Sequence, residues 1–162
     1  MSSESSRLVD QLQRAHDGDA WHGSPLMAVL AGVTHEQAVR RLPNDGHSIW
    51  ELVLHVTGWR TEVARRATGE PAAEPPAGDW PDVGDPTAAR WADALAALGA
   101  SHQRLVAVTS GLSDERLLER TNDPRNRPLG TGVTYYELLH GIVQHDAYHA
   151  GQIAIVKKIL GI

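Results

Sequence analysis

Residues 134–160 read TYYELLHGIVQHDAYHAGQIAIVKKIL, and this segment has both a helix start and a helix stop. Thr134 is followed three residues later by Glu137, the capping-box pattern that satisfies free N–H groups at the beginning of a helix. Gly161 comes directly after the last apolar residue and is a common helix terminator. The sequence therefore predicts one long helix over residues 134–160.

This predicted helix has an apolar face that also carries two histidines. At roughly 100° per residue, one stripe contains Leu138, Ile142, Ile153, Val156 and Leu160. His145 and His149 fall on the same stripe, one turn apart. Each imidazole needs a partner there, because burying an unpaired polar group costs roughly 2–7 kcal/mol. A shared cation, as in zinc-binding HExxH helices, would satisfy both rings, and so would separate hydrogen bonds. The HxxxH pattern alone leaves both interpretations open.

The composition is that of an ordinary globular domain. The chain has 162 residues, of which 41% are hydrophobic and 22% charged, and its net charge is −5. This length suits one domain, so we assign residues 1–162 to a single helical domain. The acidic balance and the absence of a basic cluster argue against a nucleic-acid partner and against an anionic membrane surface.

The chain contains no cysteine. This excludes disulfides, cysteine metal ligands and a protein thiol nucleophile, and it fits a reducing compartment. No hydrophobic run reaches the length of about 18 residues that a membrane-spanning helix needs, and the polar start MSSESS lacks an apolar signal region. We therefore expect a cytoplasmic protein.

Helical periodicity and capping signals recur along the rest of the chain. Long helices are predicted over 5–16, 49–68 and 86–109, with shorter ones over 26–30, 34–42 and 113–118. Irregular segments at 70–86 and 121–132 separate them, and no strand-like alternation is present. Together with residues 134–160 this predicts an all-α fold, a four-helix bundle with long loops between the helices.

Bundles commonly build metal sites from side chains on facing helices, so a third ligand is expected from a neighbour of the histidine helix. His55 is the best candidate, because it lies in the middle of the 49–68 helix at the edge of its apolar stripe, beside Leu52 and Trp59. The alternative is a half-exposed histidine that only contacts Trp59. Helix geometry alone slightly favours this alternative.

The segments SIWELVLHVTGW (48–59) and HDAYHAGQI (145–153) occur in this order, with their histidines 90 residues apart. In order, spacing and expected architecture they resemble the two signatures of the DinB/YfiT-like superfamily. The resemblance implies a four-helix bundle whose divalent metal is held by one histidine of the second helix and two of the fourth. Residue by residue, it assigns the metal to His55, His145 and His149.

The resemblance also implies a chemistry. Three neutral histidines leave open positions on a metal for water or substrate, with zinc or nickel the first choices and manganese or iron also compatible. Members of the superfamily include transferases that use a low-molecular-weight thiol. This implies a metal-dependent transferase acting on a small-molecule substrate, whereas the same metal could activate water in a hydrolase. The sequence is also compatible with a non-catalytic metal-binding stress-response module and with a plain helical interaction domain, and no catalytic residue is assigned.

Further expectations concern the surroundings of the site and the assembly. Candidate partners for the metal-bound rings are Asp146, Gln152 and Glu62, and segment 70–86 is expected to border the pocket as a mobile loop anchored by Trp80. The resemblance implies a homodimer, for which Trp50 and Leu54 are candidate interface residues. Of the remaining histidines, His22 could reach the pocket, His140 points away from it, and His16, His35, His47 and His102 show no clustering.

Overall fold

The computed structural model describes residues 3–43, 46–121 and 123–162 and shows an all-α fold in this part of the chain. Its helices are α1 (Glu4–His16), α2 (Leu26–Leu30), α3 (His35–Ala38), α4 (Ile49–Ala67), α5 (Ala88–Ser110), α6 (Asp114–Leu118) and α7 (Tyr135–Leu160). The described residues form no strand, only two isolated β-bridges. The predicted fold class is therefore confirmed.

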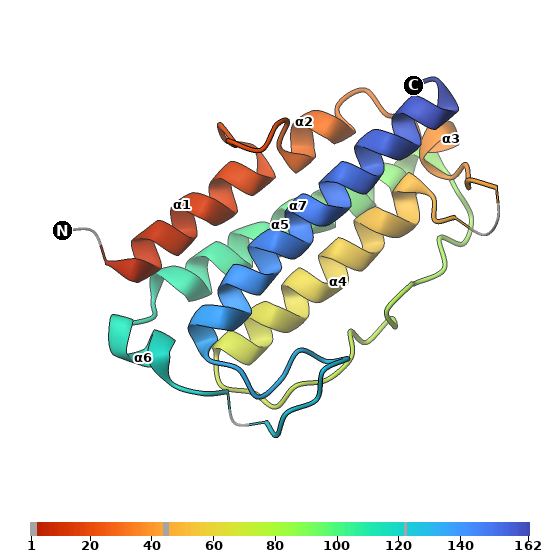
Figure 1. The fold of residues 1–162 in the computed structure, drawn as a ribbon. Coiled ribbons are helices and arrows are strands. Elements are labelled where there is room, and N and C mark those ends of the chain that lie inside the picture. The colour runs from red at the N-terminus through yellow and green to blue at the C-terminus, as the bar shows by residue number, and fades with distance from the viewer. Residues whose placement is uncertain (1–2, 44–45, 122) are drawn as a thin grey trace.

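The four long helices, α1, α4, α5 and α7, lie side by side as a bundle (Figure 1). Helix α4 packs against α5 and α7, and α1 packs against the same two helices from the other side. The short helices α2, α3 and α6 lie in the connections between them. Because α4 and α7 are neighbours, the segments that carry His55 and the HxxxH pair face each other.

Local capping explains where the two site-bearing helices begin. Ser48 and Glu51 form a capping box at the start of α4, and Thr134 and Glu137 form another at the start of α7. Gly161 ends α7 in the left-handed region, at φ 69°, where glycine carries no steric penalty. Helix α5 begins two residues after the predicted start at 86, because Thr87 is its N-cap.

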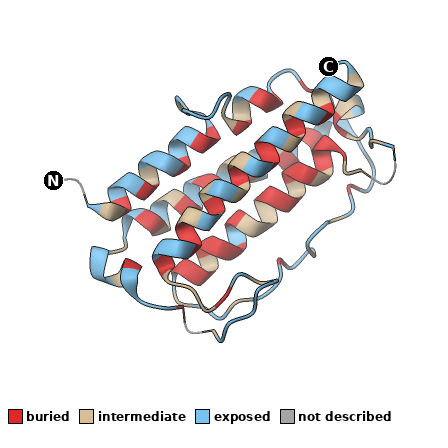
Figure 2. Cartoon of the chain, in the orientation of Figure 1, coloured by how far each residue is buried: buried red, intermediate tan, exposed pale blue. Residues whose placement is uncertain are grey.

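The core forms where the inward faces of the long helices meet (Figure 2). Trp50 lies in this core, only 2% exposed, and its ring centroid is 5.1 Å from that of Trp91 on α5. Leu54 is partly buried against the same cluster. The expectation that Trp50 marks a dimer face is therefore wrong, because a helix of its own chain already covers this side chain.

Among the described residues, none of the helices combines the length and the apolar character that crossing a lipid bilayer requires.

Candidate metal centre

Three histidines from two helices meet at the interface of α4 and α7. His145 Nε2 lies 3.0 Å from His55 Nε2 and 3.1 Å from His149 Nε2. One nitrogen from each ring lies within 4.8 Å of the other two. His55 and His149 are buried, whereas the His145 side chain is 27% exposed. The structure thus brings together all three histidines that the sequence singled out.

The outer nitrogens of two of these rings have acceptors that fix the tautomer. His55 Nδ1 donates to the carbonyl oxygen of Asp79 at 2.7 Å, and His149 Nδ1 donates to Gln152 Oε1 at 2.6 Å. The Gln152 amide nitrogen donates to the Tyr148 hydroxyl, which leaves its oxygen for the imidazole. A neutral ring that is protonated at Nδ1 carries a lone pair at Nε2.

The inner nitrogens of His55 and His149 therefore lack protons. The Nε2 lone pairs of His55 and His149 both point at His145 Nε2, which can hold at most one hydrogen. A single cation satisfies all three nitrogens at once. Metal–nitrogen bonds of about 2.0–2.1 Å in tetrahedral geometry place neighbouring nitrogens about 3.3 Å apart, within a few tenths of an ångström of the observed distances. The residues fit a divalent metal.

Burial keeps two of these imidazoles neutral. It lowers the pKa of His149 to about 4, with the neighbouring His145 ring adding to the effect. Burial also lowers the pKa of His55, although the hydrogen bond to the Asp79 carbonyl opposes this. Both rings are thus in the unprotonated state that metal binding requires near neutral pH.

Asp146 lies behind His145 as part of a buried ion pair. Its Oδ2 atom accepts a hydrogen bond of 3.0 Å from Arg60 Nε, and both side chains are 0% exposed. Its Oδ1 atom lies 3.9 Å from His145 Nδ1. Burial raises the pKa of the Asp146 carboxyl, but the Arg60 guanidinium and the His145 ring together outweigh this and the net pKa is lowered. A fixed negative charge thus stands next to the outer nitrogen of His145.

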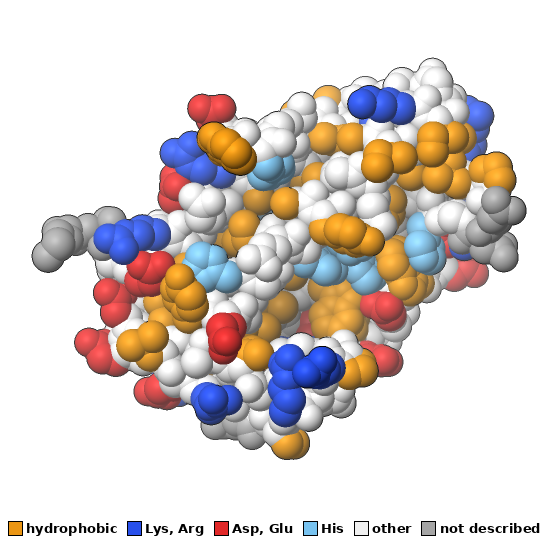
Figure 3. Space-filling model, in the orientation of Figure 1, with side chains coloured by type: hydrophobic (Ala, Val, Ile, Leu, Met, Phe, Trp, Pro, Cys, Tyr) orange, Lys and Arg blue, Asp and Glu red, His pale blue; other side chains and the backbone are white. Residues whose placement is uncertain are grey.

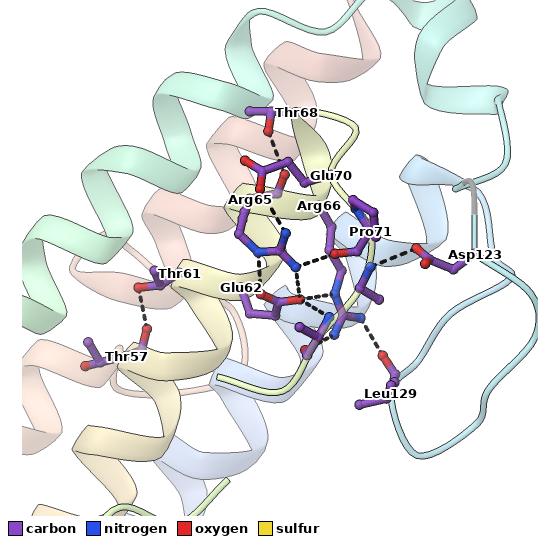
Figure 4. Close-up of polar contacts among 12 residues, drawn as sticks. Thr57, Thr61, Glu62, Arg65, Arg66, Thr68, Glu70, Pro71, Asp123 and Leu129 are labelled. Carbon is purple, nitrogen blue, oxygen red and sulfur yellow. Dashed lines mark hydrogen bonds and ion pairs between the residues drawn. The ribbon is translucent and has the colours of Figure 1, made fainter. Parts of the chain in front are cut away.

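Glu62 does not join the histidines, contrary to the expectation. It is the centre of a separate network at the C-terminal end of α4 (Figure 4). Its carboxylate accepts hydrogen bonds from Arg65, from Arg66 Nε at 2.9 Å and from the backbone N–H of Ala73 at 2.7 Å. Its role is to tie the start of the 70–86 segment to the bundle.

The 70–86 segment covers the histidines through Trp80, the residue that was expected to anchor it. Trp80 stacks between two imidazoles, 4.0 Å from the ring centroid of His55 and 3.5 Å from that of His47. It is 37% exposed, so the buried anchors of the loop are Val83 and Pro75, which were not predicted. The segment has no periodicity that could have indicated these contacts.

A cavity of about 400 Å³ reaches His145 from the side of the bundle where α4 ends and α7 begins. Its walls are helices α4 and α7 and the segment between α6 and α7, so the predicted loop 70–86 does not line it. On the molecular face that Figure 3 shows, histidines gather next to hydrophobic side chains, with basic side chains below them. The cavity is lined by Trp59, Val63, Arg66, Arg125, Arg127, Pro128, Leu129, Gly130, Val133, Glu137, Leu138, Gly141, Ile142 and His145.

The remaining histidines lie outside the centre, and the sequence pattern did not indicate how three of them pack. The rings of His16 and His102 stack at 3.9 Å in the core beside Arg60. The ring of His47 stacks on Trp80. His22 is exposed and His140 packs on Tyr136, so neither belongs to the three-histidine cluster.

The sequence comparison agrees with this architecture. The chain matches the DinB superfamily over residues 10–153, which is most of its length and includes all three histidines. The protein therefore belongs to the DinB superfamily. Comparison with curated proteins and with solved structures gives no significant match.

Proposed function

We propose that this protein is a metal-dependent enzyme in which His55, His145 and His149 hold one divalent cation. The observation that carries the proposal is the convergence of three Nε2 atoms on one point, with the tautomers of His55 and His149 set by outer acceptors. Hydrogen bonding of this kind to the outer nitrogen is the usual support for metal-bound histidine. Zinc and nickel suit three imidazoles best, and manganese and iron are also compatible.

The open side of the centre supports a catalytic role over a purely structural one. A closed structural site would use four protein ligands, whereas here three histidines stand beside a cavity that reaches His145. A bound divalent cation would deprotonate a coordinating thiol at neutral pH. We therefore propose a transferase that activates a low-molecular-weight thiol toward a small-molecule substrate.

The residues around the cavity favour this reaction over hydrolysis. A hydrolase needs a general base beside the attacking water. Among the described lining residues the one carboxylate is Glu137, and its Oε2 atom is occupied as the capping acceptor of Thr134 at 2.7 Å. The protein's part in the transferase reaction is to bind and orient the reactants, to exclude water with Trp80 and Trp59, and to keep the imidazoles neutral.

Elemental analysis of protein purified without a histidine tag tests the proposal. We expect one equivalent of metal per chain in the native protein and none in His55→Ala, His145→Ala or His149→Ala. His22→Ala is the matched control, because His22 is an exposed histidine outside the cluster. Thiol-dependent conversion of an electrophile should then follow metal content across this series. Full metal retention in His55→Ala would rule out the proposed ligand set.

A cytoplasmic location is part of the same proposal. The chain has no cysteine, which suits a reducing compartment where low-molecular-weight thiols are abundant.

A further inference from the structure

Hydrogen bonds and one close backbone contact fix the conformation of residues 124–132, which contribute to the cavity wall. Thr131, which is 3% exposed, donates from its hydroxyl to the Pro124 carbonyl at 2.6 Å and accepts from Asn126 N–H at 2.8 Å. Gly132 has φ +69°, and a Cβ atom there would lie 2.7 Å from the Cα atom of Arg125. Only glycine permits this approach. The position of Arg125 at the cavity wall is therefore specified by the fold.

The three arginines that line the cavity differ in whether their guanidinium groups form ion pairs within the protein. Arg66 is paired with Glu62 and also donates to the carbonyl oxygens of Leu129 and Ala73, so it serves as a tether for the wall. The Nη1 group of Arg125 donates a hydrogen bond to the Thr131 carbonyl oxygen at 2.7 Å. In the described part of the chain, neither Arg125 nor Arg127 forms an ion pair.

Most of the lining that α4 and α7 contribute is apolar. Trp59 and Val63 lie on α4 and Leu138 and Ile142 lie on α7, and His145 lies on α7 one turn beyond Ile142. The cavity thus has apolar side chains, a metal-site histidine and two guanidinium groups that form no ion pair among the described residues. The lining also contains the Glu137 carboxylate, whose pKa is lowered mainly by its hydrogen bonds to Thr134 and to a small extent by the charge of Arg125, so the two guanidinium groups leave an excess of positive charge. This positive charge is local, because the whole chain carries a net charge of −5.

We propose that the cavity binds a small organic carboxylate, with its carboxylate group on Arg125 and Arg127 and its apolar body against Trp59, Val63, Leu138 and Ile142. Guanidinium groups match the planar carboxylate in shape and charge, and the apolar wall selects against a bare inorganic anion. The inference deepens the proposed function and rests on it in one respect. The reacting end of the substrate is placed at His145 because the proposed metal lies there.

Isothermal titration calorimetry with phenylbutyrate and with its primary amide tests whether the cavity prefers a carboxylate. Both probes carry the same apolar body, so the difference in affinity isolates the contribution of the charge. We expect the wild-type protein to bind the carboxylate about fivefold more tightly than the amide, in the metal-free and the zinc-loaded state alike. Inorganic phosphate at millimolar concentration should leave phenylbutyrate binding unchanged.

Substitution of the two arginines locates the preference. Arg127→Gln and Arg125→Gln should each weaken phenylbutyrate binding about threefold to tenfold and leave amide binding unchanged, while Arg125→Lys restores part of the loss. Arg104→Gln, at an exposed position on α5 outside the cavity, is the matched control and should change neither affinity. Arg125→Gln could also destabilise the fold and lower the thermal midpoint. In that case Arg127→Gln is the deciding variant, since the Arg127 side chain forms no hydrogen bond or ion pair among the described residues.

Equal affinities for the acid and the amide, or an unchanged preference in Arg127→Gln, would overturn the inference. So would failure of the wild-type protein to bind either probe. These results are separable from a failure of the proposed function. A protein that prefers the carboxylate but binds no metal supports the cavity assignment and refutes the metal enzyme. A protein that binds metal but shows no preference for the carboxylate supports the metal site and refutes the cavity assignment.

Discussion

The Gln152 side chain touches a single ring nitrogen, yet this contact decides which nitrogen of His149 faces the metal site. Without the acceptor at 2.6 Å, the ring is free to rotate or to take the other tautomer. Loss of such an outer contact typically lowers metal affinity by about 10–100-fold. We therefore expect Gln152→Leu to weaken zinc binding about tenfold, measured by competition with a chromogenic chelator.

Gln152→Glu is the matched control for this experiment, because it keeps an acceptor at the same position. Zinc affinity in this variant should equal or exceed that of the wild type. If the leucine and glutamate variants lose affinity equally, the contact to His149 Nδ1 has no role in metal binding.

The buried pair of Arg60 and Asp146 gives a second prediction for single residues. Replacing Arg60 by Met leaves the Asp146 carboxylate buried without its partner, which typically costs about 3–5 kcal/mol of unfolding free energy. The double variant Arg60→Met, Asp146→Asn should recover part of this loss, because it leaves no unpaired charge at this position. Urea unfolding measures both variants. Arg14→Met serves as the control, since it breaks an ion pair in which both side chains are about half exposed.

For single residues, the sequence indicates the three candidate metal ligands better than it indicates the groups that hydrogen-bond to them or pack beside them. His145 and His149 are spaced four apart, so helix geometry alone places them on one face, and the family resemblance supplies His55. The acceptor of His55 Nδ1 is a backbone carbonyl in an aperiodic loop, and a backbone carbonyl has no residue-type signal. Arg60 was missed for another reason. A charged residue inside a helix normally faces solvent, and only the partner on α7 allows its burial.

At the scale of the elements, His16 connects the end of α1 to the bundle and makes stability depend on pH. Its Nδ1 atom lies 3.3 Å from Arg60 Nη1 of α4, which requires an unprotonated ring, and its ring stacks on His102 of α5. Burial lowers the pKa of His16 to about 4; Arg60 and His102 add to this, while Asp17 and Asp146 oppose it. The folded protein therefore resists protonation of a side chain that the unfolded chain protonates near pH 6.5.

The sign of the effect follows from these two pKa values. Between pH 6.5 and about 4 the unfolded chain binds a proton that the native state excludes, so stability falls as the pH is lowered, by at most about 3 kcal/mol. His16→Leu should flatten this part of the profile, measured by urea unfolding in the presence of a chelator to remove metal effects. His22→Ala should keep the wild-type slope. An unchanged slope in His16→Leu would contradict the assignment.

The 70–86 segment is predicted to remain more mobile than the helices, despite its contacts to the histidines. Few of its backbone N–H groups donate a hydrogen bond within the protein, and those that do belong to Ala72, Ala73, Gly78 and Gly84. Amides without a hydrogen-bonded partner exchange quickly. Hydrogen exchange should therefore be faster at Trp80 and Val83 than in the middle of α7. Equal protection in the two regions would show that the loop is as rigid as the bundle.

Element boundaries with side-chain caps were predictable, whereas irregular segments were not. Ser48 and Thr134 mark the starts of α4 and α7 because serine and threonine caps act within four residues of sequence. The wall of the cavity depends on Gly132 packing against Arg125 and on Arg66 reaching Leu129. Such contacts join distant or irregular positions, so no local pattern indicated that residues 125–133 border the cavity.

At the scale of the whole molecule, a metal held by His55, His145 and His149 joins α4 to α7. Binding to the native state alone stabilises a protein by about 2.7 kcal/mol when the free metal is at 100 times its dissociation constant. We expect zinc to raise the thermal midpoint and a chelator to return it to the metal-free value. His149→Ala should abolish the zinc effect, and His22→Ala should retain it. A midpoint that does not respond to zinc in the wild type would contradict the site.

The homodimer remains a proposal, but Trp50 is no longer a candidate interface residue because it is buried within its own chain. Helix α7 exposes Tyr148, Ile155 and Ile159, each more than half accessible to solvent. Exposed apolar side chains on one helix face are typical of an interface. Sedimentation at tens of micromolar should give twice the chain mass of 17.6 kDa, and Ile159→Asp should shift it to the monomer. A monomer in the wild type at that concentration would refute the dimer.

The 90 residues between His55 and His145 bear on the order in which the molecule assembles. Contacts within one helix form early in folding, whereas contacts between distant segments must wait until the intervening chain is placed, here α5 and α6. The three imidazoles therefore converge only once the bundle is nearly complete. An interaction absent from the transition state changes the unfolding rate and leaves the folding rate alone. Bound metal would therefore slow unfolding and leave the folding rate unchanged.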